Sequence, residues 1–198
     1  MVKEMEYPEG ATPLDADELD GLKFPHVTTR GELDHLEQAN IEAGLLWLNR
    51  KKDPDILNDQ FVRSLHKRLF GEVWRWAGSY RLTEKNIGVA PGQITVQLRG
   101  LLDDVRYWVN NNIYNPIEGA IRFHHRMVYI HPFPNGNGRH ARIMADALLE
   151  KVHKTQALDW SGSTDLQCMN ERRKQYIAAL RAADSGDYGP LFIFVGHE

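Results

Sequence analysis

The sequence predicts an all-α domain that carries one small β-hairpin. Apolar residues recur at three- and four-residue spacing through most of the chain, which is typical of amphipathic helices. The segments between these stretches are short and rich in Gly, Pro, Asn and Asp, as expected for turns. Residues 83–98 instead alternate apolar with polar or small residues around Pro91-Gly92, and this alternation predicts the hairpin.

The predicted helices follow one another with short breaks. The first 25 residues are expected to be extended. Helices are then expected over residues 32–48, 56–70, 117–130, 139–152 and 165–183. Asp53-Pro54 favours a break between the first two of these helices. Trp74, Trp76 and Tyr80 come soon after the second, and aromatic residues at this density are typical of core packing.

Composition limits the classes of function. The chain has 198 residues, of which 42% are hydrophobic, so it can bury one substantial core as a single domain. A net charge of −3 provides no overall positive field, so nucleic acid is not an expected partner. The single cysteine, Cys168, excludes an internal disulfide. No apolar run is long enough to span a membrane, and the acidic N-terminus lacks the apolar core of a signal peptide. We therefore expect a cytoplasmic protein.

The most informative segment is residues 131–142, which lies between two predicted helices. Pro132 biases His131 out of helical backbone, so the first of these helices should end at His131. The following run Asn135-Gly136-Asn137-Gly138 tolerates positive φ, so its backbone N–H groups can turn inward at a helix N-terminus. An arrangement of this kind binds anions.

Two arginines support the prediction of an anion site. Arg139 and Arg142 are three residues apart, hence on one helix face, in a first turn where the helix dipole disfavours cations. A bound polyphosphate would compensate them. His131 has a near-neutral reference pKa, which suits a general base. Phe133 is expected to point into the core and anchor the loop.

The other histidines give no comparable signal. His124, His125 and His131 do not have the spacing of a common zinc site, so no metal cluster is expected from them. His140 is expected to face solvent or to pack locally.

The run from His131 to Arg142 resembles the signature of Fic-domain proteins, and the resemblance extends over about residues 60–195. It implies a Fic-type helical bundle that transfers AMP from ATP to a Ser, Thr or Tyr hydroxyl of a target protein. The preceding stretch, residues 21–41, is similar to the subgroup called mobile mystery protein B. On this basis residues 1–27 are an N-terminal extension. Residues 28–198 are a Fic domain that begins with an inhibitory helix.

The resemblance implies a role for each motif residue. His131 would deprotonate the target hydroxyl, which attacks the α-phosphate and releases pyrophosphate. The nucleotide would be bound by Gly136, Asn137 and Gly138 as an anion hole, Arg139 at the β-phosphate, Arg142 at the γ-phosphate or a regulatory carboxylate, and Ile177 and Asp184 near the base. The 83–98 hairpin would be a flap on which the target segment docks. Mobile mystery proteins resemble the products of mobile-element gene pairs. The similarity to subgroup B therefore also implies a separate regulator, encoded by the second gene of such a pair.

One position departs from the family pattern. Most members have Asp or Glu where this chain has Asn135, and that carboxylate holds Mg²⁺. The amide still offers a carbonyl oxygen as a metal ligand, but it attracts a cation less strongly. Mg²⁺ is therefore the cofactor that the resemblance implies, with a weakened ligand.

Regulation has two competing explanations at the start of the first long helix. The segment from Thr28 to Glu32 resembles the inhibitory element of many Fic proteins, in which a glutamate pairs with the second motif arginine, here Arg142. Leu33 stands where that element usually has Gly or Asn. The alternative is local: Thr29 as N-cap and Glu32 at the third helical position make a capping box.

Three classes of function stay open. The first is the AMP-transferring enzyme. The second is another phosphoryl or nucleotidyl transfer, or removal of AMP, at the same site; the kinase-like Doc subgroup has lysine near the position of Gly138, and the glycine argues against it. The third is a non-catalytic nucleotide-binding interaction module, which the neutral Asn135 keeps open.

Overall fold

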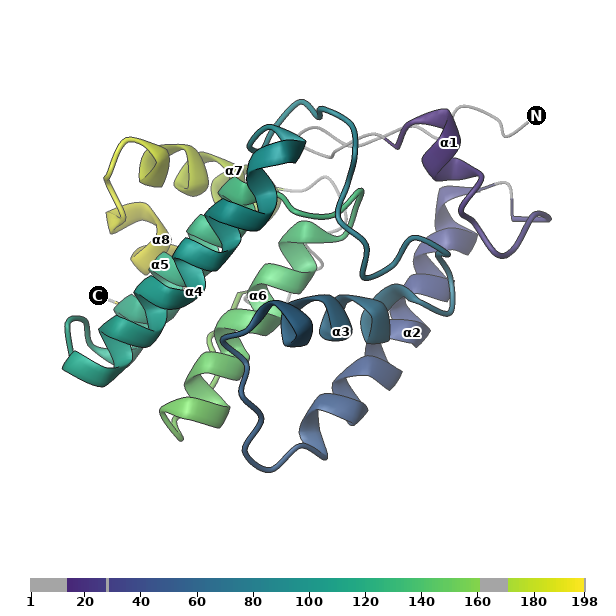
Figure 1. Ribbon diagram of the computed structural model, residues 1–198. Coiled ribbons are helices and arrows are strands. Elements are labelled where there is room, and N and C mark those ends of the chain that lie inside the picture. The colour runs from purple at the N-terminus through teal and green to yellow at the C-terminus, as the bar shows by residue number, and fades with distance from the viewer. Residues whose placement is uncertain (1–13, 28, 161–170, 198) are drawn as a thin grey trace.

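A computed structural model describes residues 14–27, 29–160 and 171–197 of the chain. Helices joined by loops make up this part of the protein, and it contains no β-strand (Figure 1). The helices are α1 (Ala16–Leu19), α2 (Arg30–Asn49), α3 (Asp59–Phe70), α4 (Ile94–Asn111), α5 (Pro116–Ile130), α6 (Asn137–Ala147), α7 (Glu171–Asp184) and α8 (Gly189–Phe194). A single 3₁₀ turn, Pro91–Gln93, precedes α4, and a π-helical turn, Leu148–Val152, continues α6.

Most of the predicted helices are confirmed, with small shifts at their ends. The helix predicted from residue 56 begins at Asp59, because the Asn58 side chain caps it by accepting a hydrogen bond of 2.8 Å from the Phe61 N–H. The helix predicted over 165–183 corresponds to α7 from Glu171 onward. Its first six residues, 165–170, lie outside the described residues.

The predicted β-hairpin over residues 83–98 is wrong. Residues 82–90 form an irregular loop, and the chain is helical from Pro91 onward. The buried apolar residues of α4 are spaced as on one helix face, and they are Ile94, Leu98, Leu101, Leu102 and Val105. This longer period outweighs the local alternation that suggested strands, and Pro91 suits the first position of a helical turn.

The N-terminal prediction of extended chain is also wrong for the described residues. Residues 16–19 form the short helix α1, which starts with a capping box between Asp15 and Glu18. The Asp15 N–H donates to Glu18 Oε2 at 2.8 Å. The Trp76 indole donates to the Glu18 carbonyl at 2.9 Å, so α1 is attached to the body of the domain. The capping signal was present in the sequence, but the segment is too short for apolar periodicity to reveal it.

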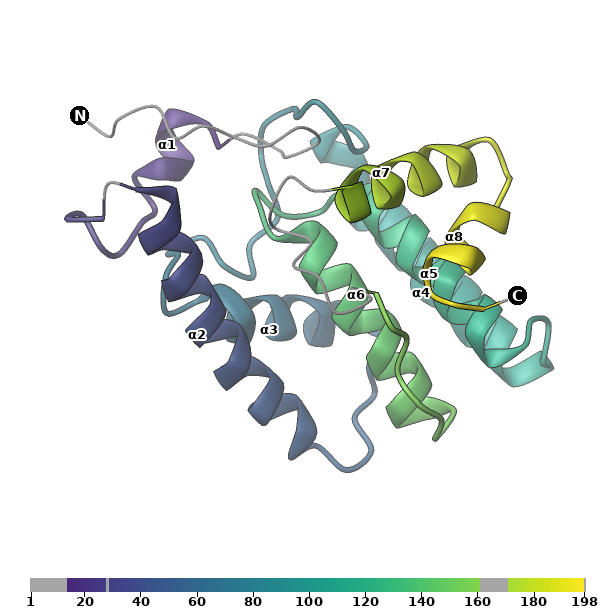
Figure 2. The ribbon, with the colours of Figure 1, turned by 180° about the vertical axis from the view of Figure 1, so that it is seen from behind.

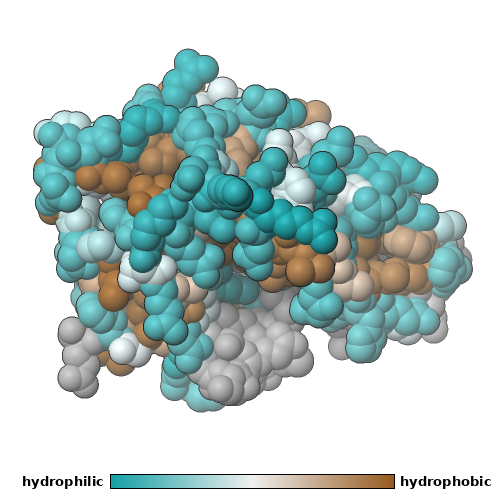
Figure 3. All heavy atoms as spheres, turned by 90° about the horizontal axis from the view of Figure 1, so that it is seen from below, coloured by the Kyte–Doolittle hydropathy of each residue, from teal (hydrophilic) through white to brown (hydrophobic). Residues whose placement is uncertain are grey.

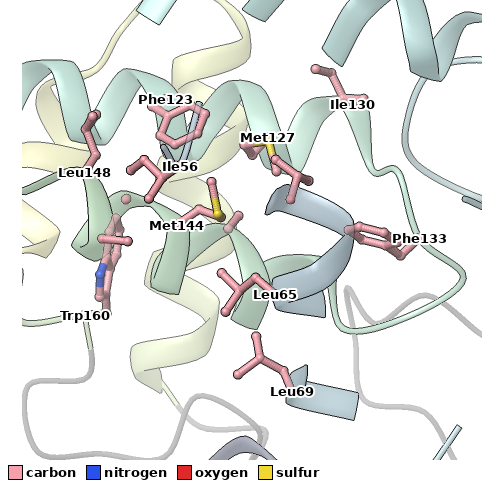
Figure 4. Packing of buried hydrophobic residues seen from close by; sticks show 14 of the residues in the cluster. Ile56, Leu65, Leu69, Phe123, Met127, Ile130, Phe133, Met144, Leu148 and Trp160 are labelled. Carbon is pink, nitrogen blue, oxygen red and sulfur yellow. The ribbon is translucent and has the colours of Figure 1, made fainter. Parts of the chain in front are cut away.

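The helices pack around a core between α3, α5 and α6. Helix α5 contacts α4 along one side and α6 along the other, and α2 packs against α3 on the far side of α6 (Figures 1 and 2). Figure 4 shows Leu65, Phe123, Met127 and Met144 meeting in this core, with Phe133 at one end. Trp74 is fully buried, and Trp76 and Tyr80 pack against the same cluster, as the sequence predicted.

The face of the molecule shown in Figure 3 is largely polar. Figure 3 shows hydrophilic side chains over most of one face, with smaller apolar patches between them. Among the described residues no helix combines the length and the apolar character needed to cross a bilayer.

Candidate active site

His131 lies where helix α5 ends. Its backbone adopts the left-handed conformation, with φ 53° and ψ 60°, and its N–H donates to the Met127 carbonyl at 3.2 Å. Left-handed backbone is costly for a residue other than glycine, and such strain concentrates at functional sites. The helix end predicted at His131 is confirmed. The reversal of the chain at this point carries the backbone directly into the loop before α6.

The His131 imidazole is buried and uncharged near neutral pH. Its residue is only 5% exposed, and burial lowers the pKa of the imidazole from 6.5 to about 4. The positive charges of Arg81 and Lys85 add to this lowering, whereas the contact of Nδ1 with the Val128 carbonyl, at 3.4 Å, opposes it. When Nδ1 carries the proton, the Nε2 lone pair is the basic one. A neutral imidazole of this kind can accept a proton.

Helix α6 begins with the glycines of the motif. Gly136 is its N-cap, with φ 77°, and a Cβ at this position would lie 2.7 Å from the Phe70 ring, so only glycine fits. The N–H groups in the first turn of an α-helix have no acceptor within the helix. The first turn of α6 begins at Asn137, and N–H groups at a helix N-terminus are suited to bind an anion. Anion binding by Gly136, Asn137 and Gly138 stays a prediction.

The side chain of Asn137 braces the loop from inside. Its Nδ2 donates to the Phe133 carbonyl at 2.8 Å, and its Oδ1 accepts from the Phe133 N–H at 2.9 Å. Phe133 is fully buried, as predicted. Asn137 can therefore contribute its backbone N–H to an anion site, but its amide is already used in holding the loop.

His66 of α3 is a site residue that the sequence analysis missed. Its Nδ1 accepts from the Gly78 N–H at 3.0 Å, which leaves Nε2 to donate to the Asn135 carbonyl at 3.0 Å. The ring also stacks on Phe133, with 3.7 Å between centroids. Burial lowers the pKa of His66 well below its ordinary value, so this tautomer is neutral. His66 thus fixes the loop that leads into α6.

The two motif arginines have different neighbours. Arg139 Nη1 forms an ion pair of 2.6 Å with Glu37 Oε2 of α2, and its guanidinium lies over the Phe70 ring. Arg142 instead lies over the ring of Tyr176 in α7, at 5.4 Å from the centroid. The two guanidinium groups thus contact different helices, that of Arg139 α2 and α3 and that of Arg142 α7.

Glu37 is the second residue that the sequence analysis missed. Its side chain is buried, and Oε1 also accepts from the Trp74 indole at 2.7 Å. A signal was available, because Leu33, Glu37 and Ile41 are spaced four residues apart on the buried face of α2. A carboxylate within an apolar stripe indicates a partner of opposite charge elsewhere in the fold.

This arrangement of a buried histidine, a glycine turn and two arginines agrees with the comparison to known protein families. Residues 56–149 match the model of the Fic/DOC family, and this range contains the whole site described above apart from Glu37 and Tyr176. The chain contains a Fic/DOC family domain. The resemblance first seen in the run from His131 to Arg142 is thereby confirmed at the level of the family domain.

Relatives and solved structures extend the similarity beyond the Fic/DOC domain. The chain is 30% identical over 187 residues to protein adenylyltransferase fic-1 of Caenorhabditis briggsae, covering 88% of this chain and 34% of that protein. It is 29% identical to protein adenylyltransferase Fic of Nematostella vectensis, covering 85% of this chain and 39% of the relative. The chain thus spans between a third and two fifths of the length of these relatives.

Solved structures agree with the fold. A structure of Fic-1 from C. elegans aligns with a TM-score of 0.66 at 26% identity, covering 82% of this chain and 48% of that one. BepC of Bartonella tribocorum, solved with bound AMPPNP, aligns with a TM-score of 0.65, covering 96% of this chain and 93% of that one. At 17% identity the BepC similarity bears on the fold alone.

Glu32, which lies before the matched Fic/DOC domain, makes a local interaction. Its carboxylate accepts from the Thr29 N–H at 3.2 Å and from the Thr29 hydroxyl at 2.9 Å, and its N–H donates back to that hydroxyl. The capping box at the start of α2 is therefore confirmed. The ion pair between α2 and a motif arginine is made by Glu37 instead, five residues further along.

The two residues predicted near the nucleotide base lie on α7. Ile177 is partly buried and packs against the core. Asp184, at the end of α7, has Oδ1 at 2.9 Å from His125 Nε2, while His125 Nδ1 is 3.0 Å from the Tyr188 hydroxyl. The Asp184 carboxylate is thus oriented by α5, and half of its side chain remains exposed.

The donor set around Asn135 does not fit Mg²⁺. Its Oδ1 accepts from the Gly136 N–H at 2.7 Å and lies 3.4 Å from Arg139 Nη2, so this neutral oxygen faces an N–H and a cation. Mg²⁺ prefers carboxylate oxygens in octahedral geometry. Within the described ranges, no three His, Cys, Asp or Glu residues come together in a metal-binding group.

His140 is buried, so the expectation that it faces solvent is wrong, and the expectation of local packing is confirmed. Its Nε2 lies 3.0 Å from the Val62 carbonyl of α3. Because His140 falls on the side of α6 that faces α3, it belongs to the core and has no place in the anion site.

Proposed function

We propose that the protein is a protein adenylyltransferase that moves AMP from ATP to a Ser, Thr or Tyr hydroxyl of a target protein. The names of the relatives support this activity. The observation that carries it is a neutral, buried imidazole, His131, at the end of α5, with one short loop between it and the glycine N-cap of α6. One loop of the chain thus supplies both a base and a candidate anion site.

The proposed reaction needs only groups of this chain and the two substrates. ATP lies with its phosphates on the N–H groups at the start of α6, where the Gly136 N–H exchanges its hydrogen bond with Asn135 Oδ1 for one with phosphate. Arg139 contacts the β-phosphate and Arg142 the γ-phosphate. The target oxygen attacks the α-phosphorus while Nε2 of His131 takes its proton, and the bond to the bridging oxygen breaks, so that pyrophosphate leaves. Ile177 and Asp184 contact the nucleotide base in this arrangement.

The loop of residues 82–90 is the proposed docking site of the target segment. Its backbone lies against His131, since a Cβ on Gly88 would be 2.6 Å from the His131 Cβ. Leu82 is 91% exposed and Ile87 is 43% exposed, so the loop offers apolar side chains to an incoming segment. Because this loop packs against the buried His131, a target segment docked on it would bring its hydroxyl close to the proposed base.

Glu37 is the proposed restraint on activity, in place of Glu32. The ion pair with Glu37 occupies the guanidinium that would contact the β-phosphate, so ATP must compete with a carboxylate of the same chain. An inhibitory role is not needed to explain the position of Glu32, because the capping box already explains it. A separate regulatory protein, implied by the similarity to mobile mystery protein B, would act on this pair.

The neutral Asn135 favours one other candidate, a nucleotide-binding module without catalytic activity. Labelled ATP distinguishes these functions. We expect protein labelling from α-³²P-ATP by the wild type and none by His131→Ala, whereas His35→Ala, which changes an exposed histidine of α2, labels normally. Labelling from γ-³²P-ATP alone would indicate a kinase. Binding of ATP without labelling from either position would indicate the module and overturn the proposal.

A further inference from the structure

The most unusual charged side chain outside the motif is Arg81. Only 2% of this residue is exposed, and its guanidinium donates to backbone carbonyls. Nε donates to the His131 carbonyl at 2.6 Å, Nη1 to the Thr83 carbonyl at 2.9 Å, and Nη2 to the Val89 carbonyl. Nη2 also lies 3.5 Å from the Ile130 carbonyl. One buried guanidinium thus donates hydrogen bonds to two separate segments of the chain.

The first of these segments is the end of α5. The last carbonyls of a helix receive no hydrogen bond from an N–H of the same helix. A buried carbonyl without a donor lowers the stability of the fold. At His131 the backbone is already in the left-handed conformation. The hydrogen bond from Arg81 therefore fixes the carbonyl of the residue that carries the proposed base.

The second segment is the 82–90 loop. Arg81 binds it near both ends, through the carbonyls of Thr83 and Val89. Two backbone hydrogen bonds extend the attachment: the Arg81 N–H donates to the Pro132 carbonyl at 2.9 Å, and the Val89 N–H to the Ile130 carbonyl at 3.4 Å. The loop and the end of α5 therefore share one set of donors, and neither can move without a change at the other.

We propose that Arg81 is a positioning residue that couples the target-docking loop to the base His131. The inference rests on the proposed function, because His131 and the loop have these roles only in a transferase. The acceptors of Arg81 lie in residues 83–89 and 130–131, whereas the proposed phosphate contacts begin at Gly136. Loss of Arg81 should therefore impair transfer and spare ATP binding.

The first test compares three arginine variants. Arg81→Met should lower kcat for transfer by about 100-fold, the effect of a displacement near 1 Å at a reacting group. Its Kd for ATP should stay within about threefold of the wild type. Arg81→Lys should recover part of kcat, since an ammonium can donate to some of the same carbonyls. Arg106→Met, which removes a similar hydrogen bond to the Leu57 carbonyl, should leave both quantities unchanged.

Two glycine substitutions, one a test and one its control, keep the proposal testable if Arg81→Met does not fold. A Cβ on Gly88 would lie 2.6 Å from the His131 Cβ and 2.7 Å from Arg81 Nη2, and the backbone there has φ 106°. Gly88→Ala should displace the loop and lower kcat with the same sparing of ATP affinity. Gly92→Ala is the matched control, because nothing lies within 4 Å of its Cβ position.

A readout that does not require transfer separates this proposal from the proposed function. In the full-length protein, the imidazole resonance of His131, assigned with His131→Ala, should shift in both Arg81→Met and Gly88→Ala. Amide exchange of residues 82–90 should accelerate in the same variants. If wild-type protein transfers no AMP but these changes occur, the coupling stands and the activity fails. If Arg81→Met folds and leaves kcat, the resonance and the exchange unchanged, or loses ATP affinity in parallel with kcat, the coupling is overturned.

Discussion

Glu37 and Arg139 form an ion pair of 2.6 Å across 102 residues of sequence, and this pair joins the first long helix to the proposed phosphate site. Both side chains are largely shielded from solvent, so the attraction is weakly screened. If Arg139 contacts the β-phosphate as proposed, the Glu37 carboxylate competes with that phosphate for the same guanidinium. On this proposal, α2 opposes nucleotide binding in the conformation described.

Removal of the Glu37 charge should release Arg139 for ATP. We expect Glu37→Gln to tighten the Kd for ATP by about tenfold, which corresponds to about 1.4 kcal/mol, and to raise self-labelling from α-³²P-ATP. Calorimetric titration measures the first effect. Glu42→Gln, on an exposed position of the same helix, is the matched control. Glu32→Gly should destabilise α2 by about 1 kcal/mol through loss of the capping box, and it should leave the Kd unchanged because the ion pair with Arg139 is made by Glu37. A tighter Kd in Glu32→Gly with no change in Glu37→Gln would assign the restraint to Glu32.

The pH profile of transfer should follow the buried state of His131. Only the neutral imidazole accepts a proton, and its pKa is lowered to about 4. We therefore expect kcat/KM to stay level as the pH falls from 8 to 5 and to decrease below that, with a midpoint near 4. Steady-state rates in buffers of constant ionic strength test this expectation. A midpoint near 6.5 that vanishes on substitution of His131 would mean that the imidazole is exposed in the working enzyme.

The contact between α1 and the 82–90 loop should contribute to stability. The Lys85 ammonium lies 2.8 Å from Asp15 and 2.5 Å from Glu18, with the lysine side chain only 3% exposed. The Lys85 side chain is buried but Asp15 is half exposed, so the pair is intermediate between a surface and a buried ion pair. We therefore expect Lys85→Met to lower the free energy of unfolding by about 1–3 kcal/mol. Lys154→Met, which breaks an exposed pair with Asp53, should cost less than about 1 kcal/mol. Equal losses in the two variants, measured by urea denaturation, would contradict this account.

A carboxylate at position 135 should provide a charged metal ligand in place of the neutral Asn135 amide. The Asn135 oxygen is neutral and faces Arg139, so we expect wild-type transfer to depend only weakly on Mg²⁺. Asn135→Asp should lower the Mg²⁺ concentration at half-maximal rate by about tenfold or more. A Mg²⁺ titration of both proteins at saturating ATP provides the measurement. Identical titration curves would show that position 135 does not contact the metal.

Sequence periodicity could predict the helices that form the site. The apolar spacing before Pro132 predicts the end of α5 at His131, and the glycines that follow predict the turn into α6. The same reasoning failed for residues 83–98, because local alternation resembled strands while the apolar face of α4 extends well beyond that window. A longer window that included Leu101, Leu102 and Val105 would have indicated a helix.

Long-range side-chain pairs could not be predicted in the same way. Arg81 and His131 are 50 residues apart, and Glu37 and Arg139 are 102 apart, so no local pattern relates them. A charged residue in an apolar stripe, as at Glu37, predicts that a partner exists, but the packing of α2 against the body of the domain decides which partner it is. The site residues that the sequence missed are of this kind, and they hold or oppose the groups that it identified.

The central claim is that the N-terminus of α6 binds a triphosphate beside a base. The most direct measurement is a crystal structure of the Glu37→Gln variant soaked with a non-hydrolysable ATP analogue. We expect phosphate density on the N–H groups of Asn137 and Gly138, and on that of Gly136 released from Asn135 Oδ1, with Nε2 of His131 directed toward the α-phosphorus. Triphosphate density elsewhere on the protein, or an imidazole directed away from the phosphates, would contradict the account.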